Sequence, residues 1–153
     1  MNRYKYFLIL IIFVSCQVSN KSISSDVTGG FYETSSSGKI FYFFDKNHHK
    51  ESLKLDTETL IALKYVKKVK VVKNAFNSKN DALQIKFDKK GVVLFKEMTE
   101  RNIRGKEVCF VINNKIVHSS FMMSAVDTND SFLMFYSEEC LNYTLKYLKH
   151  SDK

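Results

Sequence analysis

The chain has 153 residues and a formal net charge of +8 at pH 7, and 44% of its residues are hydrophobic and 14% aromatic. This length and composition predict a single globular domain with one core, rather than several domains. A basic charge suggests nucleic-acid binding in a cytoplasmic protein. The N-terminus of this chain has the features of an export signal, however, so we expect no nucleic-acid partner.

The first fifteen residues are typical of a bacterial secretory signal. Arg3 and Lys5 provide positive charge, and an unbroken apolar run covers residues 7–14. This run is too short to cross a hydrocarbon layer about 30 Å thick as a helix, which favours a cleaved signal over a retained membrane span. We therefore expect residues 1–15 to be removed, which lowers the formal charge by two, to +6.

Residues Phe13-Val14-Ser15-Cys16 end this segment, and they resemble the lipobox of bacterial lipoproteins. In those proteins diacylglycerol is attached to the cysteine thiol, the signal is cut before the cysteine, and the new amine is acylated, for example with palmitate. The resemblance implies lipid attachment at Cys16 and a membrane anchor in the cell envelope, facing the periplasm or the cell exterior. The alternative is an ordinary secreted protein in which Cys16 is incidental.

Residues 16–29 predict a flexible tether. They are rich in serine, asparagine and glycine and contain almost no large apolar residue. A tether of this length reaches about 20 Å. The folded domain is expected to span residues 30–150, and its excess of lysine fits solubility and attraction to anionic headgroups or acidic partners.

Three short apolar segments open the domain and predict a β-meander. They cover residues 31–32, 40–44 and 53–55. The residues between them, 35–38 and 45–49, are serine, glycine, aspartate, asparagine, histidine and lysine, a composition that favours turns.

The next part of the chain predicts a short helix and two strands. Asp56 or Thr57 is expected to cap a helix that includes residues 60–63. Residues 66–73 alternate valine with lysine, which is typical of a strand with one solvated face, and a polyanion-binding site is the alternative. Residues 83–87 alternate apolar and polar side chains and predict a half-buried strand.

The segment after Asp88 predicts the strongest helix, capped by this aspartate and ending at Gly105. Residues 108–112 are apolar at every step, which predicts a central strand. Asn113 and Asn114 predict a tight hairpin, because asparagine tolerates positive φ. The apolar stripe of the helix consists of Val92, Leu94, Phe95, Met98 and Ile103.

A returning strand at 115–118 and a linking segment at 119–130 lead to a last strand at 132–136. Ser137 is expected to cap a final helix, whose apolar stripe consists of Leu141, Leu145 and Leu148. Together these elements predict an α+β fold, a single small domain in which two principal helices pack on one mainly antiparallel sheet. Phe95 and Phe110 should then be core residues from facing layers.

Several residues form a pattern along this order of elements. A strand, an acidic residue and a glycine open the first long helix, and an aromatic residue, a capping residue and two acids open the last one. The pattern consists of Phe87, Asp88, Gly91, Phe95, Met98, Thr99, Asn102, Gly105, Lys106 and residues 108–117, with Gly30, Phe31 and Tyr32 at the start and residues 135–148 at the end. It resembles the head subdomain of the first periplasmic domain of SecD, the export-accessory subunit of the bacterial translocase.

A SecD subunit also carries several transmembrane helices, whereas this sequence has no second apolar run of membrane length. The resemblance therefore implies a head domain alone on a lipid tether. We expect a non-catalytic binding module for an exported, translocase or envelope protein. The alternative is a structural lipoprotein that maintains the envelope and uses the head fold as a scaffold.

The partner contact is expected at Phe121, Met122 and Met123. These residues make the linking segment unusually apolar, and the segment also lacks the proline and the glycine pair of the SecD family. Recognition residues are common on loops of a rigid scaffold. A short helix that covers the core is the alternative.

The residues with catalytic potential do not form a recognisable site, and we expect no enzymatic activity, no metal and no cofactor. No pair among them has the spacing of a catalytic or metal site, although a site assembled only in space escapes this test. The two adjacent histidines are expected in a polar turn, pointing in different directions, with a metal site as the alternative. The two later cysteines are expected to stay free, with a disulfide as the alternative. The residues concerned are His48, His49, His118, His150, Cys109 and Cys140.

Overall fold

The computed structural model describes residues 28–46, 48–75, 80–102, 105–121, 128–135 and 137–149. The signal, Cys16 and all but the last two residues of the expected tether lie outside these residues. No helix in the described ranges is both long and apolar enough to cross a membrane. The elements are β1 (Gly29–Phe43), β2 (Ser52–Leu55), β3 (Ile61–Ala62), a 3₁₀ turn (Leu63–Tyr65), β4 (Val66–Val72), β5 (Ala82–Phe87), α1 (Lys89–Asn102), β6 (Glu107–Ile112), β7 (Lys115–Phe121), β8 (Asp130–Met134) and α2 (Glu138–Lys149).

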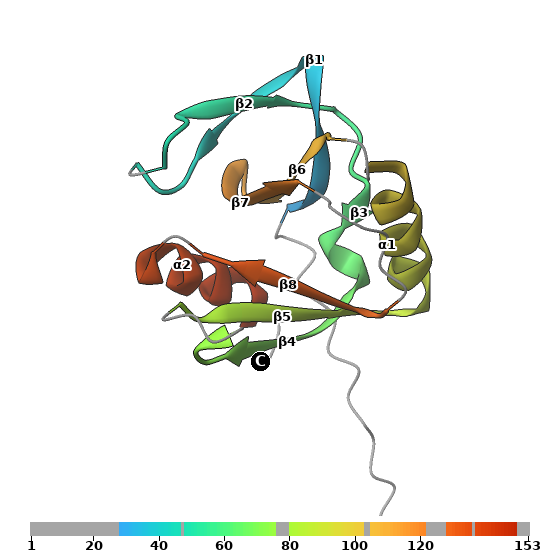
Figure 1. Cartoon of the computed structure of the whole chain (residues 1–153), viewed down its shortest axis with the longest axis vertical. Helices are drawn as coiled ribbons and strands as arrows, with labels where there is room; N and C mark the ends of the chain where they lie inside the picture. The colour runs from blue at the N-terminus through green and yellow to red at the C-terminus, as the bar shows by residue number, and fades with distance from the viewer. Residues whose placement is uncertain are drawn as a thin grey trace, which may run out of the picture.

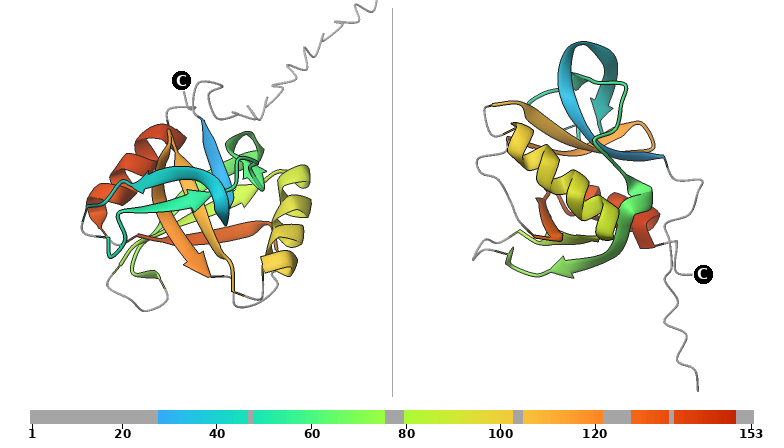
Figure 2. Two further views of the ribbon diagram at one scale, coloured as in Figure 1. Left: turned by 90° about the horizontal axis from the view of Figure 1, so that it is seen from above. Right: turned by 90° about the vertical axis from the view of Figure 1, so that its right-hand side faces the viewer.

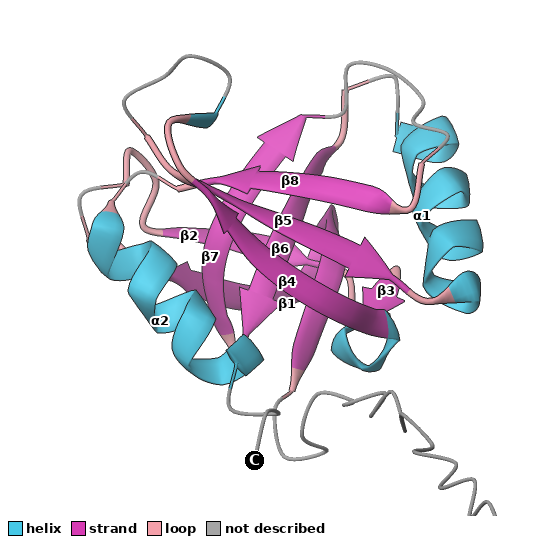
Figure 3. Cartoon of the chain, turned by 90° about the horizontal axis from the view of Figure 1, so that it is seen from below, coloured by secondary structure: helices cyan, strands magenta, loops and turns pink. Residues whose placement is uncertain are grey.

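The strands form two sheets that face each other across the main core (Figure 1). One has the order β2-β1-β6-β7 with β3 beside β1, and the other has the order β4-β5-β8. The helices α1 and α2 close opposite sides of the space between them, as the view from below shows (Figure 3). The predicted α+β class, single domain and two helices are confirmed, but the predicted single sheet is wrong.

The reason for two sheets lies in β6, whose six residues are all buried. Val108, Phe110 and Ile112 enter the main core between the sheets. Cys109 and Val111 point the other way, into a smaller core formed with the outer part of β1, with β2 and with β7. A strand that is apolar on both faces needs a covering layer on each side, which a single sheet with helices on one face does not supply.

The long strand β1 replaces the first two strands of the predicted meander. Its first five residues pair with β6, its middle with β2, and its last two with β7 (Figure 2). Thr34 and Lys39 both lie opposite Leu55, so the residues between them form a bulge. The predicted turn at 35–38 is therefore wrong, because the serine-rich segment bends the strand without ending it.

Gly38 occupies the tightest point of this bulge. A Cβ atom there would lie 1.8 Å from the carbonyl oxygen of Leu55. Only a residue without a side chain permits this approach of two backbones.

Two further predictions are corrected. In place of a helix after Asp56 there is β3 and a 3₁₀ turn, because this segment pairs with β1: the Leu60 amide donates to the Phe31 carbonyl at 2.8 Å. The expected linking segment begins too early and ends too late, since Ser119–Phe121 belong to β7 and Asp130 to β8.

The helix caps, the hairpin and the alternating strands are confirmed. Asp88 Oδ1 accepts from the Gly91 amide at 2.7 Å, and Ser137 Oγ accepts from the Cys140 amide at 3.2 Å. Asn113 and Asn114 have φ of 47° and 61°. The main core receives Phe95 and Met98 from α1, and Leu141 and Leu148 from α2.

Because both faces of β6 are buried, truncation of Phe110, which has no exposed surface, should greatly reduce the stability of the domain. Phe110→Ala should lower the free energy of unfolding by about 3 to 5 kcal/mol. The matched control is Phe121→Ala, because that ring is 53% exposed and its loss should cost about 0.5 kcal/mol or less. Denaturant unfolding measures both, and equal losses would contradict the placement of β6.

The bulge predicts that Gly38→Ala destabilises the domain by about 1 to 3 kcal/mol, because the new methyl group must displace the Leu55 carbonyl. Ser37→Ala is the control, since the Ser37 side chain is exposed. Thermal unfolding of the two variants checks this, and a stable Gly38→Ala protein would mean that β1 does not approach β2 here.

Candidate partner-binding surface

Phe121, the first residue of the predicted contact, ends β7 and leaves half of its ring in solvent. It lies opposite Glu107, the first residue of β6. Side chains opposite each other in an antiparallel pair share a face of the sheet, with Cβ atoms about 5 Å apart. Met122 and Met123 lie outside the described residues, so the structure places only one of the three predicted contacts.

A long-range ion pair lies beside this ring. Glu107 is buried, and its Oε2 accepts from Lys50 Nζ at 2.9 Å. Lys50 comes from the connection between β1 and β2, which therefore lies against the start of β6. The ammonium group of Lys50 offsets the negative charge of the Glu107 carboxylate, which lies opposite Phe121.

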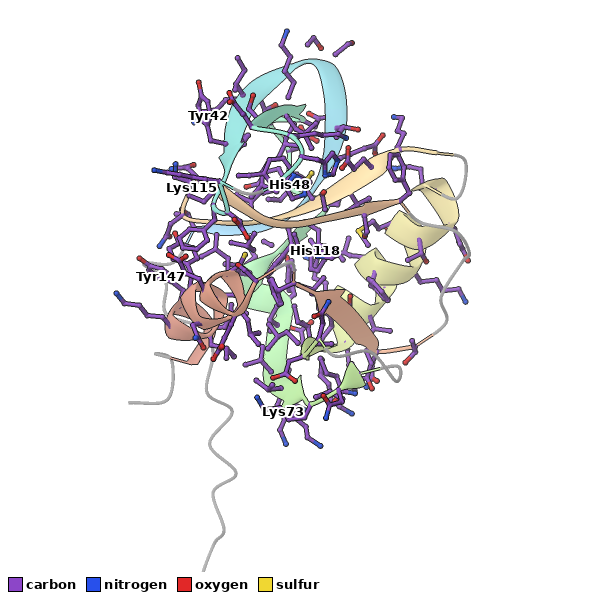
Figure 4. All side chains as sticks on the ribbon, turned by 60° about the vertical axis from the view of Figure 1, so that its left-hand side comes forward. Tyr42, His48, Lys73, Lys115, His118 and Tyr147 are labelled. Carbon is purple, nitrogen blue, oxygen red and sulfur yellow. The ribbon has the colours of Figure 1, made fainter. Side chains whose placement is uncertain are left out.

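The two adjacent histidines also lie in the connection between β1 and β2. The outer part of β1 and β2 form an arm, here called the β1–β2 arm, and His48 sits between this arm and β6 (Figure 4). The His48 ring stacks on Phe43 with a centroid separation of 3.8 Å and on His49 with 4.3 Å. The expectation of two histidines that point in different directions in a solvated turn is therefore wrong, because the rings stack and His48 is buried. Burial, with a contribution from His49, lowers the pKa of His48 and favours its neutral form.

A second exposed apolar area lies on the outer face of β1. Ile40 and Tyr42 are 49% and 56% exposed. Lys115 Nζ lies 5.8 Å from the Tyr42 ring centroid, which gives the ring a cationic neighbour (Figure 4). The two exposed areas differ in their charged neighbours. Phe121 lies beside the ion pair of Lys50 and Glu107, whereas Tyr42 lies beside the ammonium group of Lys115.

The cysteines have the environment of structural thiols. Cys109 and Cys140 are both free and buried, and burial raises the pKa of each thiol to about 12. Cys140 Sγ also donates to the Val117 carbonyl at 3.1 Å. Thiols with such a high pKa are poor nucleophiles at neutral pH.

The remaining candidates for chemistry stay apart. The His118 ring lies 6.0 Å from the Phe135 ring, in an edge contact at the main core, and His150 lies outside the described residues. Among the residues that the structure describes, no group of three or more histidine, cysteine, aspartate or glutamate side chains could hold a metal ion.

Two clefts on the described surface are small and polar. One, of about 280 Å³, lies between α1 and the segment before β3; the other, of about 240 Å³, lies at the start of α2. Both fall below the range of about 300 to 1,000 Å³ that is usual for small-molecule sites.

Sequence reasoning missed Glu107 and Lys50, and it also missed Glu33. The last is a buried carboxylate of β1 that accepts hydrogen bonds from Arg101, at 3.3 Å, and from Lys106. All three residues are charged groups whose partners lie far away in the sequence. No local pattern identifies such pairs.

No protein-family model matches this chain, and no curated protein matches it either. Its fold does match solved structures of SecDF. One, described as "a membrane component SecDF that enhances protein export", has a TM-score of 0.57 at 14% identity, over 80% of this chain and 60% of that one. Another, SecDF in "Super-membrane-facing form", has a TM-score of 0.60 at 14% identity, over 84% of this chain and 18% of that one. The chain thus spans only part of each SecDF chain, and its fold resembles that of a SecDF domain.

Proposed function

We propose that this chain is a membrane-anchored lipoprotein of the bacterial cell envelope, and that its SecDF-like domain binds a segment of an exported, translocase or envelope protein without catalysis. The observation that carries the proposal is Phe121, a half-exposed aromatic ring at the end of an outer strand. The likeness of the fold to SecDF supports export or envelope partners.

Strand addition is the binding mode that the geometry favours. β7 pairs with β6 along its inner edge, and β1 covers its outer edge only at Lys115 and Ile116. Beyond Ile116 no described strand pairs with the outer edge. The helix α2 contacts β7 at the next residue, where Cys140 Sγ donates to the Val117 carbonyl at 3.1 Å, so the stretch proposed for strand addition is 118–121. An extended segment added there would form backbone hydrogen bonds with β7 and lie next to Phe121.

The properties of Phe121 fit an anchor for such a segment. Aromatic residues often dominate binding energy, because they bury a large area at small entropic cost. The ion pair between the buried Glu107 and the partly exposed Lys50 ties the start of β6, which lies opposite Phe121, to the connection between β1 and β2. The ring therefore projects from a rigid frame.

The high pKa of both thiols fits the proposed role without catalysis, because neither cysteine is then a nucleophile at neutral pH. The competing proposal is a scaffold lipoprotein that maintains the envelope and binds nothing through β7. The two proposals differ in what Phe121 does, which makes this residue the one to test.

The membrane anchor rests on the N-terminal sequence, whose charged start, apolar run and Cys16 resemble a lipoprotein signal. The tether predicted from the composition of residues 16–29 would hold the domain within about 20 Å of the bilayer. A binding module at that distance meets proteins as they leave the membrane.

A photocrosslinking amino acid at position 121, in the full chain in living cells, should trap a discrete envelope or export protein. The same amino acid at position 42 is the matched control, because Tyr42 has a similar exposed fraction. Phe121→Ser should weaken binding of the trapped protein about thirtyfold, as expected for an aromatic anchor. Its melting temperature should stay within a few degrees of the original.

A large loss of stability in Phe121→Ser would place the ring in the core and contradict the proposal. Equal crosslinking from positions 42 and 121 would do the same, since it would show no preference for β7. The absence of any product at position 121 would favour the scaffold.

Lipidation is tested separately by feeding cells an alkyne analogue of palmitate and measuring the label on the purified chain. Cys16→Ser should abolish the label. Cys140→Ser is the control and should keep it, because a serine hydroxyl can donate the same hydrogen bond to Val117. Persistent labelling of Cys16→Ser would contradict the anchor.

A further inference from the structure

The outer strand of the smaller sheet carries three exposed lysines, Lys67, Lys68 and Lys70. Within the described part of the chain β4 pairs only with β5, so its other edge faces solvent. It lies at the end of the molecule opposite the β1–β2 arm (Figure 1).

The sheet register places like charges opposite each other. Lys68 lies opposite Lys86 of β5, and Lys86 lies opposite Asp130 of β8, with which it forms an ion pair at 3.4 Å. The Asp130 carboxylate thus pairs with Lys86, whereas Lys68 forms no ion pair with a described carboxylate. Directly opposed like charges destabilise a sheet, and the ion pair of Lys86 with Asp130 offsets only part of this repulsion.

Three more lysines extend the charge beyond β4. Lys64 Nζ and Lys90 Nζ lie 5.2 Å and 5.3 Å from the centroid of the Tyr65 ring, so two ammonium groups meet at one ring. The hydrogen bond from Lys90, with the charge of Lys64, lowers the pKa of the Tyr65 phenol, as expected in a strongly positive environment. Lys89 is exposed at the start of α1.

These six side chains are named here the lysine surface: Lys64, Lys67, Lys68, Lys70, Lys89 and Lys90. No carboxylate among the described residues forms an ion pair with any of them. Other basic side chains nearby are paired: Lys73 with Asp81, and Lys86 with Asp130. The other described lysines that form no such ion pair, Lys39, Lys46, Lys54, Lys115 and Lys146, are spread over β1, the connection after it, β2, β7 and α2.

We infer that the lysine surface docks the domain onto a bilayer that carries anionic phosphate headgroups. The charge is complementary, and the lysines spread over a strand, a turn and the start of a helix. This spread over three elements fits a broad anionic surface. Each lysine near such a surface raises the affinity about fivefold.

This docking is distinct from the proposed lipid anchor and from strand addition at β7, which lies in the other sheet. It would fix the orientation of the domain, with the small sheet toward the lipid and the β1–β2 arm away from it.

The test uses the full chain, reconstituted with vesicles of phosphatidylcholine alone or of phosphatidylcholine mixed with phosphatidylglycerol. Partition is measured by sedimentation, and lysine accessibility by an amine-reactive reagent with mass spectrometry. We expect several-fold slower labelling of Lys67, Lys68 and Lys70 on the anionic vesicles only. Molar salt should abolish this protection, because it shortens the screening length to about 3 Å.

The decisive variant is Lys67→Gln/Lys68→Gln/Lys70→Gln, and its matched control is Lys39→Gln/Lys54→Gln/Lys115→Gln. Both remove three exposed positive charges, so they change the net charge equally. The first should lower the ratio of partition into anionic over neutral vesicles about a hundredfold, and the control should lower it severalfold at most.

Equal losses in the two variants would overturn the proposal and leave the lysines as protection of an outer strand against aggregation. Protection by soluble polyglutamate, with none by anionic vesicles, would also overturn it in favour of an acidic peptide. Attachment to neutral vesicles tests the lipid anchor by itself, so failure of the anchor and failure of docking give different results.

Discussion

The burial of β6 on both faces is the constraint on which the rest of the structure depends. Alternate residues of this strand enter two different cores, with Phe110 in one and Val111 in the other. Each core needs its own cover. The smaller sheet and the two helices cover the first, and the bent strand β1 with β2 covers the second. A strand that is apolar at every step thus requires a layered domain rather than a sheet with one wet face.

The bend in β1 links this packing to the surface that we assign to partner binding. Because β1 crosses from β6 to the start of β7, it covers the outer edge of β7 only at its first residues. The same crossing brings the connection after β1 over the smaller core, where Lys50 reaches Glu107. The course of β1 therefore leaves β7 without a neighbouring strand beyond Ile116 among the described residues, and it also brings Lys50 to the strand beside β7.

Local patterns in the sequence predicted much of this fold. The caps at Asp88 and Ser137, the asparagine hairpin and the alternating strands β4 and β5 each depend on neighbouring residues, and all were found. The continuity of β1 was not predictable in this way, because serines and a glycine that favour a turn are held in a bulge by Leu55, far along the chain. The pair of Glu107 and Lys50 was missed for the same reason, since it is a product of tertiary structure. At the candidate surface, the sequence indicated Phe121 by its apolar character but gave no sign that β1 pairs with β7 only at Lys115 and Ile116.

The place where the chain enters the domain has a mechanical consequence. Gly30 lies between two strands, opposite Val111 of β6 and Ala62 of β3, in so tight a space that a Cβ atom would lie 2.2 Å from the Ile61 carbonyl oxygen. A pull on the chain before β1, directed along the strand, would load the hydrogen bonds to both neighbours together, in shear, instead of opening them one by one. If the domain is held by the chain before β1 and pulled by a bound chain, the hydrogen bonds of β1 to β3 and β6 would therefore share the load.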